Sequence, residues 1–405
     1  MSADLAQSPA YLADAERARA YAAVRAARSV PWYLWAGAVA VTSAYVGGQW
    51  DVAWHRSIGR DTFWTPAHMA IYACGVIAGI VGLYLVGMTT WGKSREAVEL
   101  RAASVGVFGL RAPLGVFLAG WGGVAMLTSA PFDNWWHNAY GLDVQIISPP
   151  HTLLILGIRA IDIGMMFLIL AAMNRAADAG DANFKRLRAL FLYLGGLLLG
   201  GMMFFIMQYT EDIMLHRVIA YACLAVAAPV AMAMMWQASR FRWAATAIAA
   251  VYSATVIAFV LIFPLFPAQP KLGPVFYPVT HLVPPNFPIL LIVPAVALDV
   301  LWQRTQRWKL WQIALVSGVV FVAVLVAVEW PFAKFLMSRA SENRFFGTMY
   351  FDYNARPDGY VRLREFVRPQ YGAVLWAGLA KTSVYAAIST WVGLLFGRWM
   401  RGVQR

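Results

Sequence analysis

The chain has 405 residues, of which 60% are hydrophobic and only 13% are charged. Soluble domains carry about 25% charged residues and about 45–50% apolar ones. This composition therefore argues against nucleic-acid binders, disordered tails and cytosolic dinucleotide-binding enzymes, and predicts an all-α polytopic integral membrane helical bundle. In a soluble protein the net charge of +13 would indicate a polyanionic partner. In a membrane protein, basic cytoplasmic loops explain it without any nucleic acid.

Residues 1–30 precede the first apolar stretch. Ser8 and Pro9 are typical of a helix N-cap and first helical residue, and an Ala/Arg-rich sequence follows them. No apolar core comes before a small-residue cleavage site, so this segment does not resemble a signal peptide. We expect an amphipathic cytoplasmic helix that lies on the membrane surface.

Apolar stretches of about 18 residues or more predict membrane-spanning helices. Residues 31–180 hold four of them and 181–332 hold five. Residues 333–371 form a polar and aromatic loop, expected to be an ordered cap on the outer face, and 372–405 hold the last helix and a cytoplasmic tail. The ten predicted spans are 32–50, 66–91, 113–131, 150–173, 187–209, 216–236, 243–266, 286–303, 310–332 and 372–397.

The distribution of basic residues predicts the orientation. Ten crossings place both termini on one side, and the loops on that side carry 20 Lys and Arg residues against 10 on the other. Seven of those 10 lie in the longest loop, 334–368, which has less influence on topology. Both termini are therefore predicted to be cytoplasmic, in a bacterial-type inner membrane. All six histidines then fall at or near the outer, periplasmic ends of helices.

One sequence motif occurs twice. Residues 51–68 read DVAWHRSIGRDTFWTPAH and residues 133–151 read DNWWHNAYGLDVQIISPPH. With one residue inserted in the second copy, seven positions match, and these are Asp51/Asp133, Trp54/Trp136, His55/His137, Gly59/Gly141, Asp61/Asp143, Pro66/Pro149 and His68/His151. Because each copy lies between two predicted spans, the repeat unit is a helical hairpin with its connecting loop.

The spacing of the repeated residues predicts a metal site in each copy. Asp51 and His55 are four residues apart and share one face of a helix. His68 begins the next helix, so a carboxylate and two imidazoles could converge on one ion and leave open coordination positions. Asp133, His137 and His151 form the equivalent set. The alternative is that these residues are interfacial and hydrogen-bond loop backbone.

Other polar residues give weaker signals. Asp61 and Asp143 are expected to cap the following helices or, as the alternative, to hold a histidine ring N–H. Asp212 and His216 repeat the Asp-x-x-x-His spacing, with His281 as a distant third ligand, and a helix start is the alternative. Within the spans, Arg159 and Asp162 are expected to pair, as is Lys381 with Asp299 or Glu329. Cys74 and Cys223 are predicted to be packing residues.

The two motifs together resemble the C subunit of the copper membrane monooxygenases, the particulate methane and ammonia monooxygenase family. That subunit has an Asp-x3-His-x12-His copper site followed by an Asn-x3-His-x13-His set. Asp51, His55 and His68 reproduce the first spacing, and RDTFWTPAH resembles the family's stretch ending in Thr-Pro-x-His. His137 and His151 fit the second set, with Asp133 in place of Asn. The resemblance covers residues 31–180.

The resemblance implies copper that activates O2 near the outer membrane surface and a small hydrophobic substrate. Asp51, His55 and His68 would then be the catalytic ligands. It also implies other membrane or cupredoxin-like subunits, and we expect an oligomer. Two alternatives remain open from the sequence: copper storage or delivery to an outer-face oxidase, and a non-haem iron protein with the same ligand types. A scaffold with vestigial sites is a third.

Overall fold

The structure is a computed structural model that describes residues 30–59, 61–141, 148–211, 213–271, 279–347, 350 and 368–405. Its first part contains α2 (Trp32–Ser57), α3 (Pro66–Trp91), α4 (Arg95–Ala102), β1 (Val105–Val107), β2 (Leu110–Ala112), α5 (Leu114–Tyr140) and α6 (Pro149–Asp178). Its second part contains α7 (Phe184–Phe205), α8 (Val218–Ser239), α9 (Ala244–Ile262), α10 (Ile292–Arg304), α11 (Leu310–Leu336) and α14 (Gly372–Met400). Short 3-10 turns are η2 (Met207–Tyr209), η3 (Met214–His216), η4 (Phe263–Leu265) and η5 (Arg339–Ser341).

A helix occurs at each of the ten predicted spans, and eight of these helices are long and apolar enough to cross a membrane. The chain is thus a multi-pass helical membrane protein. The other two are α2 and α10. The 26 residues of α2 are sufficient in length but rich in Trp, Tyr, Gly and Ala. The 13 residues of α10 rise only about 20 Å, less than a bilayer core of about 30 Å.

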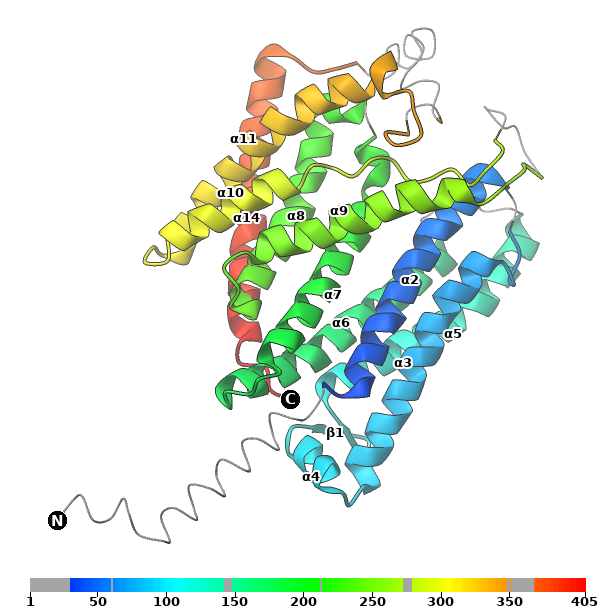
Figure 1. The fold of residues 1–405 in the computed structure, drawn as a ribbon, viewed down its shortest axis with the longest axis vertical. Coiled ribbons are helices and arrows are strands. Elements are labelled where there is room, and N and C mark those ends of the chain that lie inside the picture. Colours follow the sequence, from blue (N-terminus) through cyan, green and yellow to red (C-terminus); the bar gives the residue numbers. More distant parts are fainter. Residues whose placement is uncertain are drawn as a thin grey trace, which may run out of the picture.

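The helices form two groups that meet along α7 (Figure 1). In the first group α2 packs on α3, α5 packs on α6, and α3 packs on α5. In the second group α14 packs on α8 and α11, and α10 packs on α9 and α11. Contacts of α7 with α2 and α6 on one side and with α8 and α9 on the other join the two groups.

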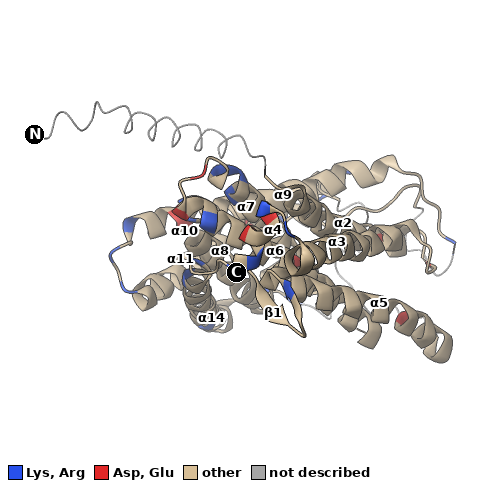
Figure 2. Cartoon of the chain, turned by 90° about the horizontal axis from the view of Figure 1, so that it is seen from below, with Lys and Arg blue, Asp and Glu red and all other residues tan. Residues whose placement is uncertain are grey.

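One end of the bundle holds the C-terminus, α4 and the β1–β2 hairpin (Figure 1). Figure 2 looks at this end and shows Lys and Arg in the connections between helices. The sequence predicts only a basic loop at 93–111, whereas the structure has a short helix and a hairpin there. Its turn places Phe108 at φ 49° and Gly109 at φ 80°, a backbone conformation in which glycine is favoured.

The repeated motif occurs in two helical hairpins, and within each hairpin a glycine allows the two helices to approach closely. A Cβ on Gly47 of α2 would lie 2.7 Å from the Ile71 side chain of α3. A Cβ on Gly122 of α5 would lie 2.5 Å from the carbonyl oxygen of Gly157 on α6. A side chain at either glycine would push the paired helices apart, so these positions help to bring the ligand-bearing helix ends together.

Charged residues within the predicted spans confirm one predicted pair, whereas Asp299 and Lys381 have other partners. Arg159 Nη1 lies 3.0 Å from Asp162 Oδ2, as expected. Asp299 does not depend on Lys381: it accepts hydrogen bonds from the backbone N–H and hydroxyl of Thr246, at 2.8 and 2.7 Å. Lys381 instead lies over the ring of Tyr385, 5.7 Å from its centroid.

The described residues test the remaining predictions on chain organisation only in part. Cys74 and Cys223 are free thiols within α3 and α8. Cys74 is buried in the core, as predicted, whereas Cys223 is only partly buried. The predicted surface helix in 1–30 lies outside the described residues except for Val30, and so do residues 348, 349 and 351–367 of the predicted cap, 333–371. The first residues of that predicted loop, up to Leu336, belong to α11.

Candidate metal centre

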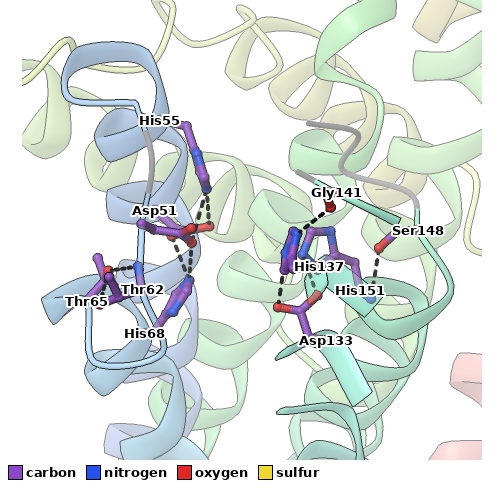
Figure 3. Close-up of polar contacts among 11 residues, drawn as sticks. Asp51, His55, Thr62, Thr65, His68, Asp133, His137, Gly141, Ser148 and His151 are labelled. Atoms are coloured by element: carbon purple, nitrogen blue, oxygen red, sulfur yellow. Dashed lines mark hydrogen bonds and ion pairs between the residues drawn. The ribbon is translucent and has the colours of Figure 1, made fainter. Parts of the chain in front are cut away.

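The first copy of the motif lies where α2 ends and α3 begins. The α2 helix continues beyond its predicted end at residue 50 as far as Ser57, so Asp51 and His55 both lie on its last two turns. His68 lies in the first turn of α3, directly after Pro66 at the helix start. Figure 3 shows these three side chains turned toward one another. The structure therefore brings together the predicted ligands of the first set.

Distances in this cluster are short. His68 Nε2 lies 3.2 Å from Asp51 Oδ1, and His55 Nε2 lies 3.8 Å from Asp51 Oδ2. Asp61 joins them: its Oδ2 lies 2.9 Å from His68 Nε2 and 3.5 Å from His55 Nε2. We call Asp51, His55, Asp61 and His68 cluster 1. It offers two imidazoles and two carboxylates.

The expectation that Asp61 caps α3 is wrong, and the alternative, contact with a histidine ring nitrogen, is what the structure shows. Thr65 is the N-cap residue of α3, and its hydroxyl accepts a hydrogen bond from the backbone N–H of Thr62 at 2.7 Å. Burial raises the pKa of the Asp61 carboxyl, but hydrogen bonds from His55 and His68 outweigh it and hold the pKa well below its usual range. Asp61 is therefore a carboxylate at neutral pH.

The second copy repeats this arrangement at the junction of α5 and α6. Asp133 and His137 lie on the last two turns of α5, which extends past its predicted end at residue 131, and His151 lies in the first turn of α6. Asp133 Oδ2 lies 3.5 Å from His137 Nε2, and Asp133 Oδ1 lies 3.3 Å from His151 Nε2. We call Asp133, His137 and His151 cluster 2. Its positions mirror those of cluster 1 (Figure 3).

Local contacts orient the imidazoles of cluster 2. His137 Nδ1 lies 3.4 Å from the carbonyl oxygen of Gly141, at a distance suited to a weak hydrogen bond. The hydroxyl of Ser148 accepts a hydrogen bond from the backbone N–H of His151 at 3.3 Å and so caps α6. The helix start thereby fixes the position of His151. Asp143, the counterpart of Asp61, lies outside the described residues.

Both clusters fit a metal ion by the chemistry of their donor atoms. One donor atom each from Asp51, His55 and Asp61 lie within 4.8 Å of one another, and so do those of Asp133, His137 and His151. Asp51 Oδ1 and Asp133 Oδ1 are buried, and among the described residues neither accepts a well-formed hydrogen bond. Each lies 3.2 or 3.3 Å from a histidine Nε2, and a cation bound between the carboxylate and the imidazoles would satisfy both.

The two clusters differ in charge and surroundings. Cluster 1 contains two carboxylates and cluster 2, in its described residues, contains one. Tyr72 follows His68 by one turn of α3, and their ring centroids are 6.1 Å apart. At cluster 2, Trp135, Trp136 and Tyr140 pack together, with Trp136 and Tyr140 centroids 4.5 Å apart. Trp135 and Trp64 are 54% and 73% exposed, which is typical of aromatic residues at a membrane surface.

The weaker third set is not assembled among the described residues. His216 is buried, with its ring centroid 4.6 Å from that of Trp330. His281 Nε2 lies 2.7 Å from the hydroxyl of Tyr350, and His281 Nδ1 lies 3.0 Å from the hydroxyl of Thr280. Asp212 lies outside the described residues. A site at Asp212, His216 and His281 stays a prediction from the sequence.

Comparisons of this chain with protein-family models, with curated proteins and with solved structures give no match. The functional argument for clusters 1 and 2 therefore depends on their own geometry.

Proposed function

We propose that this chain is a copper-binding integral membrane protein that acts as an oxidoreductase, or as the metal-binding component of one, on a small hydrophobic substrate and O2. The observation that carries the proposal is the repeated convergence of imidazole Nε2 atoms on a carboxylate at the ends of two helical hairpins. Two imidazoles and one carboxylate leave coordination positions for an exogenous ligand. In cluster 1 this role requires that Asp61 holds the imidazoles and does not bind the ion.

Several features support this proposal. The positions of the two clusters relative to their helices are equivalent, as expected for duplicated sites. Both lie at the opposite end of α2 and α5 from the α4 and β1–β2 segment (Figure 1). With the predicted orientation, that end faces the periplasm. Copper, when bound, would supply the redox chemistry, while the aspartate and histidine side chains hold the ion.

Copper is favoured over iron by the resemblance to the copper membrane monooxygenases and by the predicted outward location. Two imidazoles and a carboxylate are also the ligands of non-haem iron oxygenases, so iron is the alternative metal. Three pairs of neighbouring methionines occur, at 165–166, 202–203 and 234–235. They lie within α6, α7 and α8, and all of them except Met202 are buried, so packing of the helices accounts for them more simply than a path of soft ligands.

One observation favours the second candidate, copper storage or delivery. The His55 side chain is 47% exposed, and an exposed ligand allows a partner protein to capture or donate the ion by ligand exchange. Storage or delivery requires metal binding without oxidation of a substrate. Catalysis requires metal binding and oxidation of a substrate.

The test is metal analysis of the protein purified in detergent, together with electron paramagnetic resonance. A His55→Ala/His68→Ala variant addresses cluster 1, and His137→Ala/His151→Ala addresses cluster 2. Asp178→Ala is the control, because Asp178 pairs with Arg240 and belongs to no candidate metal site. We expect each double variant to lose the metal of its own cluster and the control to lose none. Unchanged metal content in both double variants would refute the proposal. Bound copper without O2-dependent oxidation of short alkanes, alkenes or ammonia would favour storage or delivery.

A further inference from the structure

A cavity lies beside α2 on a flank adjacent to the one that carries cluster 1. Four elements form its wall: α2, the end of α7 with η2, α9, and the segment before α10. Its volume is about 70 Å³, room for several water molecules and hence for a ligand of a few heavy atoms. No residue of cluster 1 or cluster 2 belongs to this wall.

The wall combines an apolar surface with a few polar groups. The apolar part includes Val52, Met203, Phe204, Val256 and Phe287. The polar part consists of Gln49, Arg56, Thr210, Tyr252 and Asn286. An apolar wall with few fixed polar groups is the usual composition of a small-molecule site, where the polar groups orient the ligand.

Asn286 is the polar group with unused hydrogen-bonding capacity. Its side-chain oxygen is buried and accepts no hydrogen bond from any residue that the structure describes. A buried amide without a partner is unfavourable by the cost of its lost hydration. A ligand that donates a hydrogen bond to Asn286 would remove this cost.

The backbone around Asn286 is irregular, although it lies against the membrane-spanning helices. Residues 282–290 form neither helix nor strand. The backbone N–H of Val283 donates to Ser57 Oγ at 2.7 Å, that of Ile289 donates to the Tyr252 hydroxyl at 3.2 Å, and that of Leu290 donates to Glu329 Oε2 at 2.9 Å. Irregular backbone at membrane depth occurs where it is buried in protein or lines a cavity. Side chains from α2, α9 and α11 thus hold this segment in place.

The charge of the wall favours an uncharged ligand. Arg56 is the only cationic side chain on the described wall, and its guanidinium acts on the carboxyl of Glu211, where it offsets part of the pKa increase caused by burial. A carboxylate near Arg56 reduces the attraction for a free anion. The tyrosine hydroxyl and the two amides are suited to a neutral hydroxyl or amide group.

We propose that this cavity binds a small uncharged amphipathic molecule, with an apolar body of a few carbon atoms and a single hydroxyl or primary amide group. The polar group donates to the Asn286 side-chain oxygen, and the body packs against Val52, Met203 and Val256. The proposal goes beyond the proposed function because it requires neither a metal nor a redox step.

The test measures binding of 4,4,4-trifluorobutan-1-ol to the full-length protein in detergent by fluorine NMR, with 1,1,1-trifluoropentane as a probe without the hydroxyl. We expect saturable binding that 1-butanol and butanamide displace. Asn286→Leu should weaken binding of the alcohol about five- to tenfold, as expected for one lost hydrogen bond, and leave the alkane unchanged. Val256→Phe fills the cavity and should abolish binding of both probes.

Val374→Phe is the matched control, because Val374 is 66% exposed on the surface of α14 and does not line the cavity. It should bind like the unsubstituted protein. Equal alcohol binding by the unsubstituted protein, Asn286→Leu and Val256→Phe would show only partition into detergent and would overturn the proposal. A tightly bound lipid that 1-butanol cannot displace would also overturn it. Metal content and the thermal midpoint of each variant establish that it is folded.

Discussion

Replacement of Asp61 by Asn tests whether cluster 1 depends on its second carboxylate. The substitution keeps the shape of the side chain and removes one negative charge, which lies 2.9 Å from His68 Nε2 and 3.5 Å from His55 Nε2. Loss of a partner that orients or joins metal ligands lowers affinity about 10- to 100-fold, or about 1.4 to 2.7 kcal/mol. We expect this loss at cluster 1.

The assay is a chelator competition titration with copper on detergent-purified protein in which His137→Ala and His151→Ala already silence cluster 2. Asp178→Asn is the control of equal charge change, because Asp178 pairs at 3.8 Å with Arg240 far from the clusters. Affinity should fall for Asp61→Asn alone. If Asp61→Asn and Asp178→Asn bind copper within about threefold of each other, well short of the expected loss, Asp61 has no role in binding.

Three further predictions concern the packing and charge that support the site. Gly47→Ala should lower both the thermal midpoint and the copper content at cluster 1, since an added methyl group in a tight contact costs about 1–3 kcal/mol. Gly48→Ala, with no atom within 4 Å of the new methyl, should leave the copper content unchanged and should not lower the midpoint, because alanine favours a helix interior. Equal losses in the two variants would contradict the packing argument. Asp299→Leu should cost about 1–3 kcal/mol in thermal unfolding because Thr246 loses its acceptor, and an unchanged midpoint would contradict this. For the metal-free protein, Asp61 has a folded pKa below its unfolded value, so its stabilising contribution is complete above about pH 5 and is lost as pH falls further. The difference in thermal midpoint between unsubstituted and Asp61→Asn protein should therefore shrink as pH falls below about 5, and a difference that grows as pH falls would show the opposite sign of shift.

Local sequence was sufficient for the elements that bear the site. Apolar stretches predict a helix at every one of the ten positions, because a segment that enters a bilayer must satisfy its backbone within itself. The i, i+4 spacing of Asp51 and His55, and of Asp133 and His137, predicts a shared helix face because an α-helix has 3.6 residues per turn. Pro66 and Pro149 mark the starts of the helices that carry His68 and His151.

Spacing did not determine which side chains from separate elements would meet. Asp61 lies in a loop, and a loop residue's direction depends on how α2 and α3 close around it. Its contact with both imidazoles therefore required the tertiary structure. The cavity has the same origin, since residues 49–56, 200–210, 252–256 and 285–289 are far apart in sequence and meet only because α7 joins the two helix groups.

The sequence by itself thus determined the class of the protein, its helices and the two sets of candidate ligands. Apolar stretches specify the helices, and a motif repeated between neighbouring helices specifies the ligands. The tertiary structure alone decided three things: the second carboxylate of cluster 1, the backbone partners of Asp299, and the polar cavity beside α2. Each of these depends on contacts between separate segments of the chain, and such contacts are determined by the packing of the helices against one another.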